Sequence, residues 1–246
     1  PTFRDRFRRE VELGMRVHSR FTTRLLAADV DAPQPWMATE FVDGPSLSEA
    51  VADGPLDQNA VLAIAAGAAQ ALIDIHAAGV THRDLKPGNI LLTDTGPRIV
   101  DFGIARAGDQ TAMTATGIVM GAPGFLSPEQ VEGNETTPAS DVFSWGCSVC
   151  YAATGQSPFG EGAPAALMFR VVQQDPDIPD IPDLLTPLVE AALSKDPAGR
   201  PTPDEIASAL SLGVIAPADG DTDATVLLVE QNWQIPTGIF PDTRKV

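Results

Sequence analysis

Residues 80–92 read Val-Thr-His-Arg-Asp-Leu-Lys-Pro-Gly-Asn-Ile-Leu-Leu, a polar loop that enters from a β-branched pair and leaves into an apolar strand. The loop holds Asp84, Lys86 and Asn89 in one short turn. An acceptor, a point cation and a neutral oxygen ligand together suit phosphoryl transfer, which needs positioning, charge neutralisation and a divalent ion. The stretch therefore predicts a loop that handles phosphoryl groups.

A second polar signal follows a strand shortly afterwards. Residues 98–103 read Arg-Ile-Val-Asp-Phe-Gly, so that a strand delivers one carboxylate to its end. Asp101 is a hard oxygen donor suited to Mg²⁺ that bridges phosphates. We expect Asp84, Asn89 and Asp101 to converge on a magnesium-bound triphosphate.

Composition excludes several classes of protein. The 246 residues are 43% apolar and 20% charged, which rules out a collagen, a coiled coil, a disulfide scaffold and a fully disordered chain. No run of about 18 consecutive apolar residues occurs, so no membrane span is expected. The net charge of −17 disfavours nucleic-acid binding. Residues 1–24 carry seven Arg against three acidic residues, and we interpret them as a solvated helix face.

The two cysteines, Cys147 and Cys150, lie in a run that is apolar on every side. This pattern indicates a buried helix, and we expect both to be core residues. A redox or zinc site would need a turn presenting both thiolates, or a second pair. The low number of cysteines fits a reducing compartment.

The predicted elements begin with strands and continue with helices. A helix is predicted over 2–19, with Glu10 on its apolar face, followed by strands over 22–30 and 35–42. A long Ala-rich helix has Asp57 as its N-cap and ends at Gly79. Later helices are predicted over 138–154, 164–174, 184–194 and 203–212. Residues 225–229 are predicted as a strand or a docking segment.

The motifs together resemble the protein kinase family. Its signatures are matched, in order and spacing, by His-Arg-Asp-Leu-Lys-Pro-Gly-Asn (82–89), Asp-Phe-Gly (101–103), Ser-Pro-Glu (127–129), Ser-Asp-Val-Phe-Ser-Trp-Gly (140–146), Gly-Gln-Ser-Pro-Phe (155–159) and Lys-Asp-Pro-Ala-Gly-Arg-Pro (195–201). The resemblance covers residues 2–212, and Lys86 makes it similar to serine/threonine kinases. Phe-Arg-Arg-Glu, Asp-Phe-Gly-Ile-Ala-Arg and Leu-Ser-Pro-Glu-Gln are similar to bacterial receptor-type kinases of actinobacteria.

The resemblance implies an α+β, protein kinase-like fold. Residues 1–42 would be a remnant of the small β-rich N-lobe, with helix C and the last strands only. Residues 43–212 would form the mainly helical C-lobe, and 213–246 an acidic linker or tail. The Gly-rich loop and the strand lysine of the family would lie before Pro1, so we expect an N-terminally truncated chain that is weak or inactive alone.

The resemblance also implies roles at the site, with ATP and Mg²⁺ as cofactors. Asp84 would accept or orient the substrate hydroxyl proton, and Lys86 would steady the transferred phosphoryl group. Asn89 and Asp101 would ligate Mg²⁺, and Glu10 would pair with the strand lysine beside ATP. Adenine would be contacted by backbone groups of Glu40 and Val42, with Thr39 at the gatekeeper. Supporting roles would fall to Asp141, which braces the catalytic loop, and to an ion pair of Glu129 with Arg200.

The segment between Asp-Phe-Gly (101–103) and Ser-Pro-Glu (127–129) contains the threonines at which regulation by phosphorylation is expected. Thr114 and Thr116 match the activation-loop phosphorylation positions of the bacterial family, and Arg83 would read the phosphate. Ala122 stands where the family usually has a Thr that contacts the catalytic Asp and Lys. We interpret His82 as a structural hydrogen-bonding residue and His76 as an ordinary helix residue.

The predicted function is ATP-dependent phosphorylation of Ser and Thr hydroxyls on proteins, with activation-loop autophosphorylation. Expected partners are protein substrates, ATP and a second kinase for trans-autophosphorylation, with no nucleic acid. The expected location is the cytoplasm, with a parent anchored to the membrane by a segment outside the chain. The alternative is a pseudokinase, an ATP-binding scaffold without turnover, which Ala122 and the missing start favour. A small-molecule phosphotransferase ranks lowest, because those enzymes resemble His-Gly-Asp at the loop and lack Ser-Pro-Glu.

Overall fold

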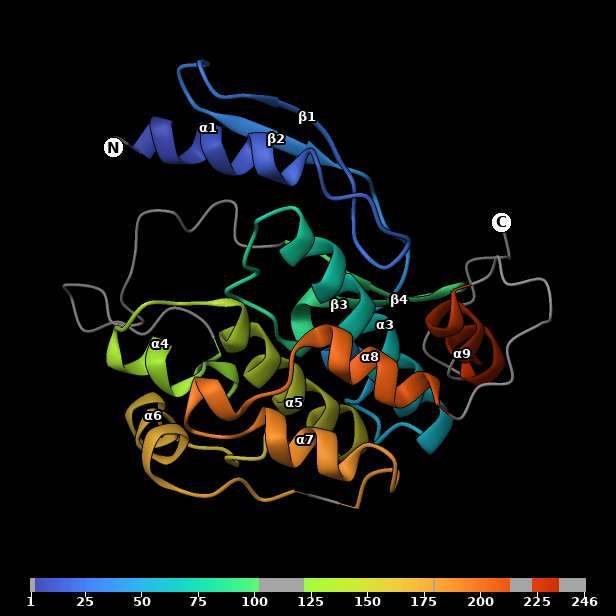
Figure 1. The fold of residues 1–246 in the computed structure, drawn as a ribbon. Coiled ribbons are helices and arrows are strands. Elements are labelled where there is room, and N and C mark those ends of the chain that lie inside the picture. Colours follow the sequence, from blue (N-terminus) through green and yellow to red (C-terminus); the bar gives the residue numbers. More distant parts are fainter. Residues whose placement is uncertain (1–2, 102–121, 179, 213–222, 235–246) are drawn as a thin grey trace.

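One helix and a two-stranded sheet form the first part of the chain. The computed structural model describes residues 3–101, 122–178, 180–212 and 223–234. Helix α1 (Phe3–Gly14) precedes the antiparallel strands β1 (Leu25–Asp29) and β2 (Trp36–Thr39). Figure 1 shows these three elements together on one side of a mostly helical body. The predicted helix and strands are confirmed in type, but each is shorter than its pattern.

Helices dominate the described residues that follow. Their bounds are α2 (Leu47–Ala50), α3 (Gln58–Ala77), α4 (Pro128–Glu132), α5 (Pro138–Thr154), α6 (Pro164–Gln173), α7 (Thr186–Ala192) and α8 (Pro203–Ser211). Short 3₁₀ turns lie at η1 (Pro87–Asn89), η2 (Pro123–Phe125) and η3 (Pro197–Gly199). The fold is the expected kinase-like α+β arrangement with a mainly helical larger part.

Helices α3 and α5 form the centre of the core. The Asp57 side chain caps α3 by accepting from the backbone N–H of Ala60, and Gly79 follows the helix with φ +79°. Helix α5 is buried along most of its length. Cys147 and Cys150 lie inside it, and burial raises the pKa of the Cys150 thiol to about 12. The prediction that both cysteines are core residues is confirmed.

Helix α3 has the length and apolar composition of a membrane span. In the structure 67% of its most apolar window is buried inside the protein, as expected for a core helix.

A second antiparallel pair sits on the face of this core. Strands β3 (Ile90–Thr93) and β4 (Gly96–Ile99) pair with Ile90 opposite Ile99. The connection from β2 crosses the hairpin at Gly44. A Cβ on Gly44 would lie 2.2 Å from the carbonyl oxygen of Leu92, so only glycine allows this approach.

The end of the described chain is a helix. Residues 225–229, predicted as a strand or docking segment, fall within α9 (Ala224–Asn232), which packs against α3 (Figure 1). The strand prediction is therefore wrong. Residues 213–222 and 235–246 of the predicted linker lie outside the described residues, and the division at residues 42 and 212 stays a prediction.

Candidate active site

The backbone of the loop of residues 82–89 is hydrogen-bonded to one buried carboxylate, that of Asp141. Asp141 on α5 has 1% exposure, and it accepts hydrogen bonds from the backbone N–H groups of His82 and Arg83, each at 2.8 Å. A buried carboxylate needs such donors to offset its desolvation. These bonds also fix the backbone of Arg83 at φ +66°, a conformation that residues other than glycine adopt rarely. Asp141 thus sets the backbone that presents Asp84.

Three polar side chains of this loop form one network. The Lys86 ammonium donates to Oδ2 of Asp84 at 2.8 Å. The amide nitrogen of Asn89 donates to the carbonyl oxygen of Asp84 at 2.8 Å and to its Oδ2 at 3.3 Å. The Lys86 ammonium and the Asn89 amide therefore fix the orientation of the Asp84 carboxylate.

Asn89 and Asp101 are brought to the same end of the β3–β4 hairpin. Asn89 directly precedes β3, and its carbonyl accepts from the backbone N–H of Val100 at 3.0 Å. Asp101 directly follows Val100. It is exposed to solvent, and its backbone φ is +54°. An amide oxygen and a carboxylate are hard donors, so these two side chains fit Mg²⁺.

His82 links the loop to this hairpin from the buried side. Its Nε2 donates to the carbonyl of Val100 at 3.2 Å, and its Nδ1 accepts from the backbone N–H of Asp84 at 3.3 Å. Burial lowers the pKa of His82, because desolvation outweighs the charges of Asp141 and Asp84. Its place and bonds are those of a structural residue.

Glu10 reaches the loop from α1. Its Oε1 lies 3.5 Å from the Arg83 guanidinium, and its buried Oε2 has no hydrogen-bond partner among the described residues. Burial raises the pKa of Glu10 to about 7, against the opposing charges of Arg83 and Arg6. The pKa of Glu10 is therefore set mainly by burial, because its contact with Arg83 is long and one of its oxygens has no partner among the described residues.

The segment after β2 carries the residues expected near adenine. Glu40 is tied to β4, since its Oε1 accepts from Arg98 at 2.6 Å. The Glu40 N–H donates to the carbonyl of Arg24 at 2.9 Å. Val42 is half-buried two residues later, and Thr39 is exposed at the end of β2. The resemblance did not anticipate the bond with Arg98.

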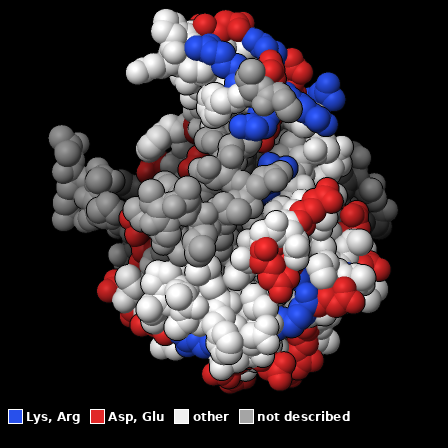
Figure 2. Space-filling model, turned by 90° about the vertical axis from the view of Figure 1, so that its left-hand side faces the viewer, with Lys and Arg blue, Asp and Glu red and all other residues white. Residues whose placement is uncertain are grey.

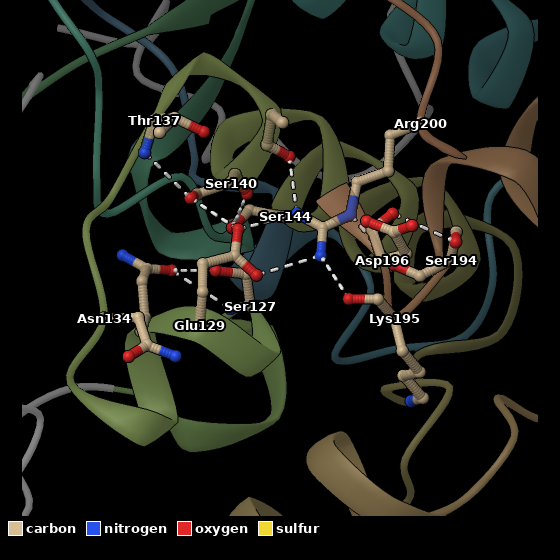
Figure 3. Close-up of polar contacts among 12 residues, drawn as sticks. Ser127, Glu129, Asn134, Thr137, Ser140, Ser144, Ser194, Lys195, Asp196 and Arg200 are labelled. Atoms are coloured by element: carbon tan, nitrogen blue, oxygen red, sulfur yellow. Dashed lines mark hydrogen bonds and ion pairs between the residues drawn. The ribbon is translucent and has the colours of Figure 1, made fainter. Parts of the chain in front are cut away.

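A buried ion pair locks α4 to the loop before α8. Arg200 donates to both carboxylate oxygens of Glu129, at 2.7 and 2.9 Å (Figure 3). Its remaining donors reach the carbonyls of Ala139, Ser194 and Lys195. Burial alone would raise the pKa of Glu129, but bonds from Arg200 and Ser140 lower it below its usual value. The buried carboxylate of Glu129 is thus compensated by the Arg200 guanidinium and the Ser140 hydroxyl.

Part of the predicted site lies outside the described residues. Thr114 and Thr116 fall within 102–121 and receive no structural description. Ala122 is described and directly precedes η2.

Charge is distributed unevenly over the surface. Figure 2 shows the largest group of Lys and Arg side chains at the end where α1 lies, while most of the charged side chains on the lower part of this face are Asp and Glu. Arg8 on this helix pairs with Asp31 at 2.6 Å, so the basic segment is partly neutralised within the molecule.

His76 contacts the buried carboxylate of Asp141, which was not predicted from the sequence. His76 on α3 was interpreted as an ordinary helix residue, but its Nε2 contacts Oδ2 of Asp141 at 2.8 Å. No local pattern marks this contact, because Asp141 lies 65 residues away in the chain.

Comparisons with known proteins agree with these features. The family model described as protein kinase domain matches residues 2–210. The chain is 45% identical over 210 residues to "Probable serine/threonine-protein kinase PkwA" of Thermomonospora curvata, which covers 85% of this chain and 28% of the relative. It is 43% identical over 211 residues to the serine/threonine-protein kinase AfsK of Streptomyces coelicolor, which covers 85% of this chain and 26% of AfsK. A third relative is the serine/threonine-protein kinase PknB of Mycobacterium leprae, 37% identical over 81% of this chain and 34% of PknB. The chain therefore spans about a quarter to a third of the length of these relatives.

Proposed function

The chain belongs to the protein kinase family, in its bacterial serine/threonine branch, and from this membership we propose that its site transfers the terminal phosphoryl group of ATP to Ser or Thr hydroxyls of proteins. The observation that carries the proposal is the network of Asp84, Lys86 and Asn89, beside the hairpin that ends before Asp101.

The loop residues divide the chemistry of the transfer. The substrate hydroxyl oxygen bonds to the terminal phosphorus as the bond to the ADP oxygen breaks, and Asp84 receives the hydroxyl proton. Lys86, 2.8 Å from Asp84, neutralises charge on the transferred group. The Lys86 contact also keeps the Asp84 carboxylate oriented before the substrate arrives.

Asn89 and Asp101 would hold Mg²⁺ at the open end of the β3–β4 hairpin, opposite its turn. The metal supplies charge neutralisation for the phosphate oxygens. The bond from the Asn89 amide nitrogen to the Asp84 carbonyl fixes the orientation of this amide, and its oxygen is the atom that can ligate a cation. Glu10 would stand beside ATP, and Glu40 and Val42 would offer backbone groups to adenine.

Regulation follows from the same loop. We propose that Thr114 and Thr116 accept phosphate by autophosphorylation, and that Arg83 binds that phosphate. The Arg83 side chain is 44% exposed, and its ion pair with Glu10 is long, at 3.5 Å, so the guanidinium can exchange partners. Phosphopeptide mass spectrometry on protein incubated with Mg-ATP should find both phosphothreonines, and the absence of both on active protein would contradict the proposal.

A pseudokinase is the second candidate, and Ala122 is the observation that favours it. Without a hydroxyl at this position, the catalytic Asp and Lys lose one expected contact. ATP binding without transfer is the result that this candidate requires.

The decisive experiment uses the natural full-length protein with Mg-ATP and a generic protein substrate. Asp84→Asn should abolish phosphate transfer, whereas Asp53→Asn, an exposed carboxylate outside the site, should leave it unchanged. Transfer that survives Asp84→Asn would overturn the proposed role. Protein substrates, a kinase dimer and a cytoplasmic location belong to the same proposal.

A further inference from the structure

Helix α9 has no part in the function proposed above. It lies beyond residues 2–210, which match the protein kinase domain, and it has nine residues. Isolated helices shorter than about 12–15 residues are marginal in water. Its helical state therefore depends on packing against the rest of the protein, and helix formation and docking occur together.

Apolar contacts hold α9 on the helical body. Leu228 and Val229 are 2% and 1% exposed where α9 packs on α3 and α8 (Figure 1). Glu230 lies 3.1 Å from Arg20, but both side chains are exposed and such pairs stabilise little. Docking is therefore governed by the buried residues rather than by the ion pair.

Helix α9 and the residue after it, Trp233, contact both strands of the β3–β4 hairpin at its turn end. The indole Nε1 of Trp233 donates to the carbonyl of Thr93 at 2.9 Å. On the other strand, Val229 lies against Gly96, where a Cβ would come within 2.9 Å of the Val229 methyl. Thr93 and Gly96 are paired with each other at this end.

The opposite end of the hairpin carries the candidate magnesium ligands. Asn89 precedes β3, and Asp101 follows β4 by one residue. Each strand has four residues, so the contacts at the turn end lie roughly 13 Å from the ligands at about 3.3 Å per residue. A two-stranded pair has little stability alone, so its orientation depends on the elements that pack against it.

We propose that residues 223–233 act as a C-terminal strap, which docks on α3 and α8 and fixes the β3–β4 hairpin. Docking of the strap and binding of Mg-nucleotide at the far end of the hairpin then favour each other, because coupling between two binding events is reciprocal. The coupling rests on the proposed function in placing Mg-nucleotide at Asn89 and Asp101. Docking itself does not.

The test uses the natural full-length protein and begins without nucleotide. Leu228→Asp places a charge in the docking interface, and Gln231→Ala changes an exposed residue of the same helix as the matched control. Hydrogen exchange should become faster in 223–233 and in 90–99 for Leu228→Asp, and stay unchanged in α5. Faster exchange confined to 223–233 would show a helix that docks without holding the hairpin, and would overturn the proposal.

Nucleotide binding is then measured by calorimetry with Mg-ADP. Leu228→Asp should weaken Mg-ADP binding about fivefold or more, and Gln231→Ala should not. Trp233→Phe removes the bond to Thr93 and part of the ring packing while it adds no charge, and it should give a smaller loss, which keeps the test informative where Leu228→Asp unfolds the protein. Unchanged affinity in both strap variants would overturn the coupling. A wild-type protein that binds no Mg-ADP would instead refute the proposed function, while the exchange data still decide whether the strap holds the hairpin.

Discussion

Glu10 and Glu129 are two largely buried carboxylates, and the pKa of Glu10 is raised whereas that of Glu129 is lowered. Glu129 receives both arms of Arg200 and the hydroxyl of Ser140, which lower its pKa despite burial. Glu10 has one contact of 3.5 Å and a buried oxygen without a partner among the described residues, so burial dominates and raises its pKa. At this scale the number of donors decides whether a buried charge is tolerated.

The pKa of Glu10 makes stability depend on pH. Because the folded pKa is about 7 and the ordinary value is 4.5, the folded state binds more protons between these values, and stability falls as pH rises through this window. Glu10→Gln should therefore stabilise the protein at pH 8 by about 1–3 kcal/mol and have little effect at pH 4. Urea unfolding at both pH values measures this, and an equal effect at both would contradict the assignment.

The buried pair of Glu129 and Arg200 should behave as a unit. Arg200→Met should cost about 3–5 kcal/mol, because it leaves the Glu129 carboxylate buried and uncompensated. Glu129→Leu combined with Arg200→Met should recover most of this loss, since neither charge is then left behind. Urea unfolding of the single and double variants gives the comparison. A double variant less stable than Arg200→Met would show that burial of the lone carboxylate is not the cause.

At the scale of elements, the catalytic loop is held between two long helices. Asp141 from α5 holds the backbone of His82 and Arg83, and His76 from α3 contacts the same carboxylate at 2.8 Å. The strained φ of Arg83 persists because both helices constrain it. Helix–helix packing in the core thereby determines the geometry of the site.

His76→Ala should consequently affect both stability and activity. Asp141 loses one of its donors, at a cost of about 1–3 kcal/mol, and the loop loses part of its support. His18→Ala provides the control, because His18 is exposed and contacts only a nearby carbonyl in the described part of the chain. Thermal unfolding and phosphate transfer measure the two effects, and wild-type values for His76→Ala would refute the supporting role.

Over the whole molecule, a net charge of −17 works against compactness. Raising NaCl from about 20 mM to about 200 mM screens this repulsion. The melting temperature should rise by about 2–4 °C, the shift expected for roughly 1 kcal/mol in a protein of this size. Differential scanning fluorimetry across the salt series tests this, with potassium chloride as a check on ion identity. A melting temperature that falls with salt would mean that attractive pairs, such as Arg8 with Asp31, outweigh the repulsion.

Local pattern predicted helices α3, α5, α6, α7 and α8 to within about two residues at each end, and predicted the end of α1 and the type of residues 225–229 less well. Helices α3 and α5 follow from an N-cap, a terminating glycine and apolar residues at every turn. Helix α1 ends at Gly14, earlier than its periodicity suggests, because glycine lacks the propensity to continue it. Residues 225–229 combine three β-branched residues with two leucines, as in a strand, yet α9 is helical since packing on α3 overrides propensity.

The amino-acid sequence alone was enough to predict the kinase family, the loop of Asp84, Lys86 and Asn89, and the strand that ends before Asp101. Each of these motifs is a short run of consecutive residues, so the residue types and their local spacing are enough to identify it. The three-dimensional structure was needed to show that His76 contacts Asp141, that Glu10 lies by Arg83 with one oxygen lacking a partner among the described residues, and that α9 contacts the hairpin. Such contacts join residues that are 65 to 140 positions apart, and their formation depends on how buried surfaces pack rather than on any local pattern.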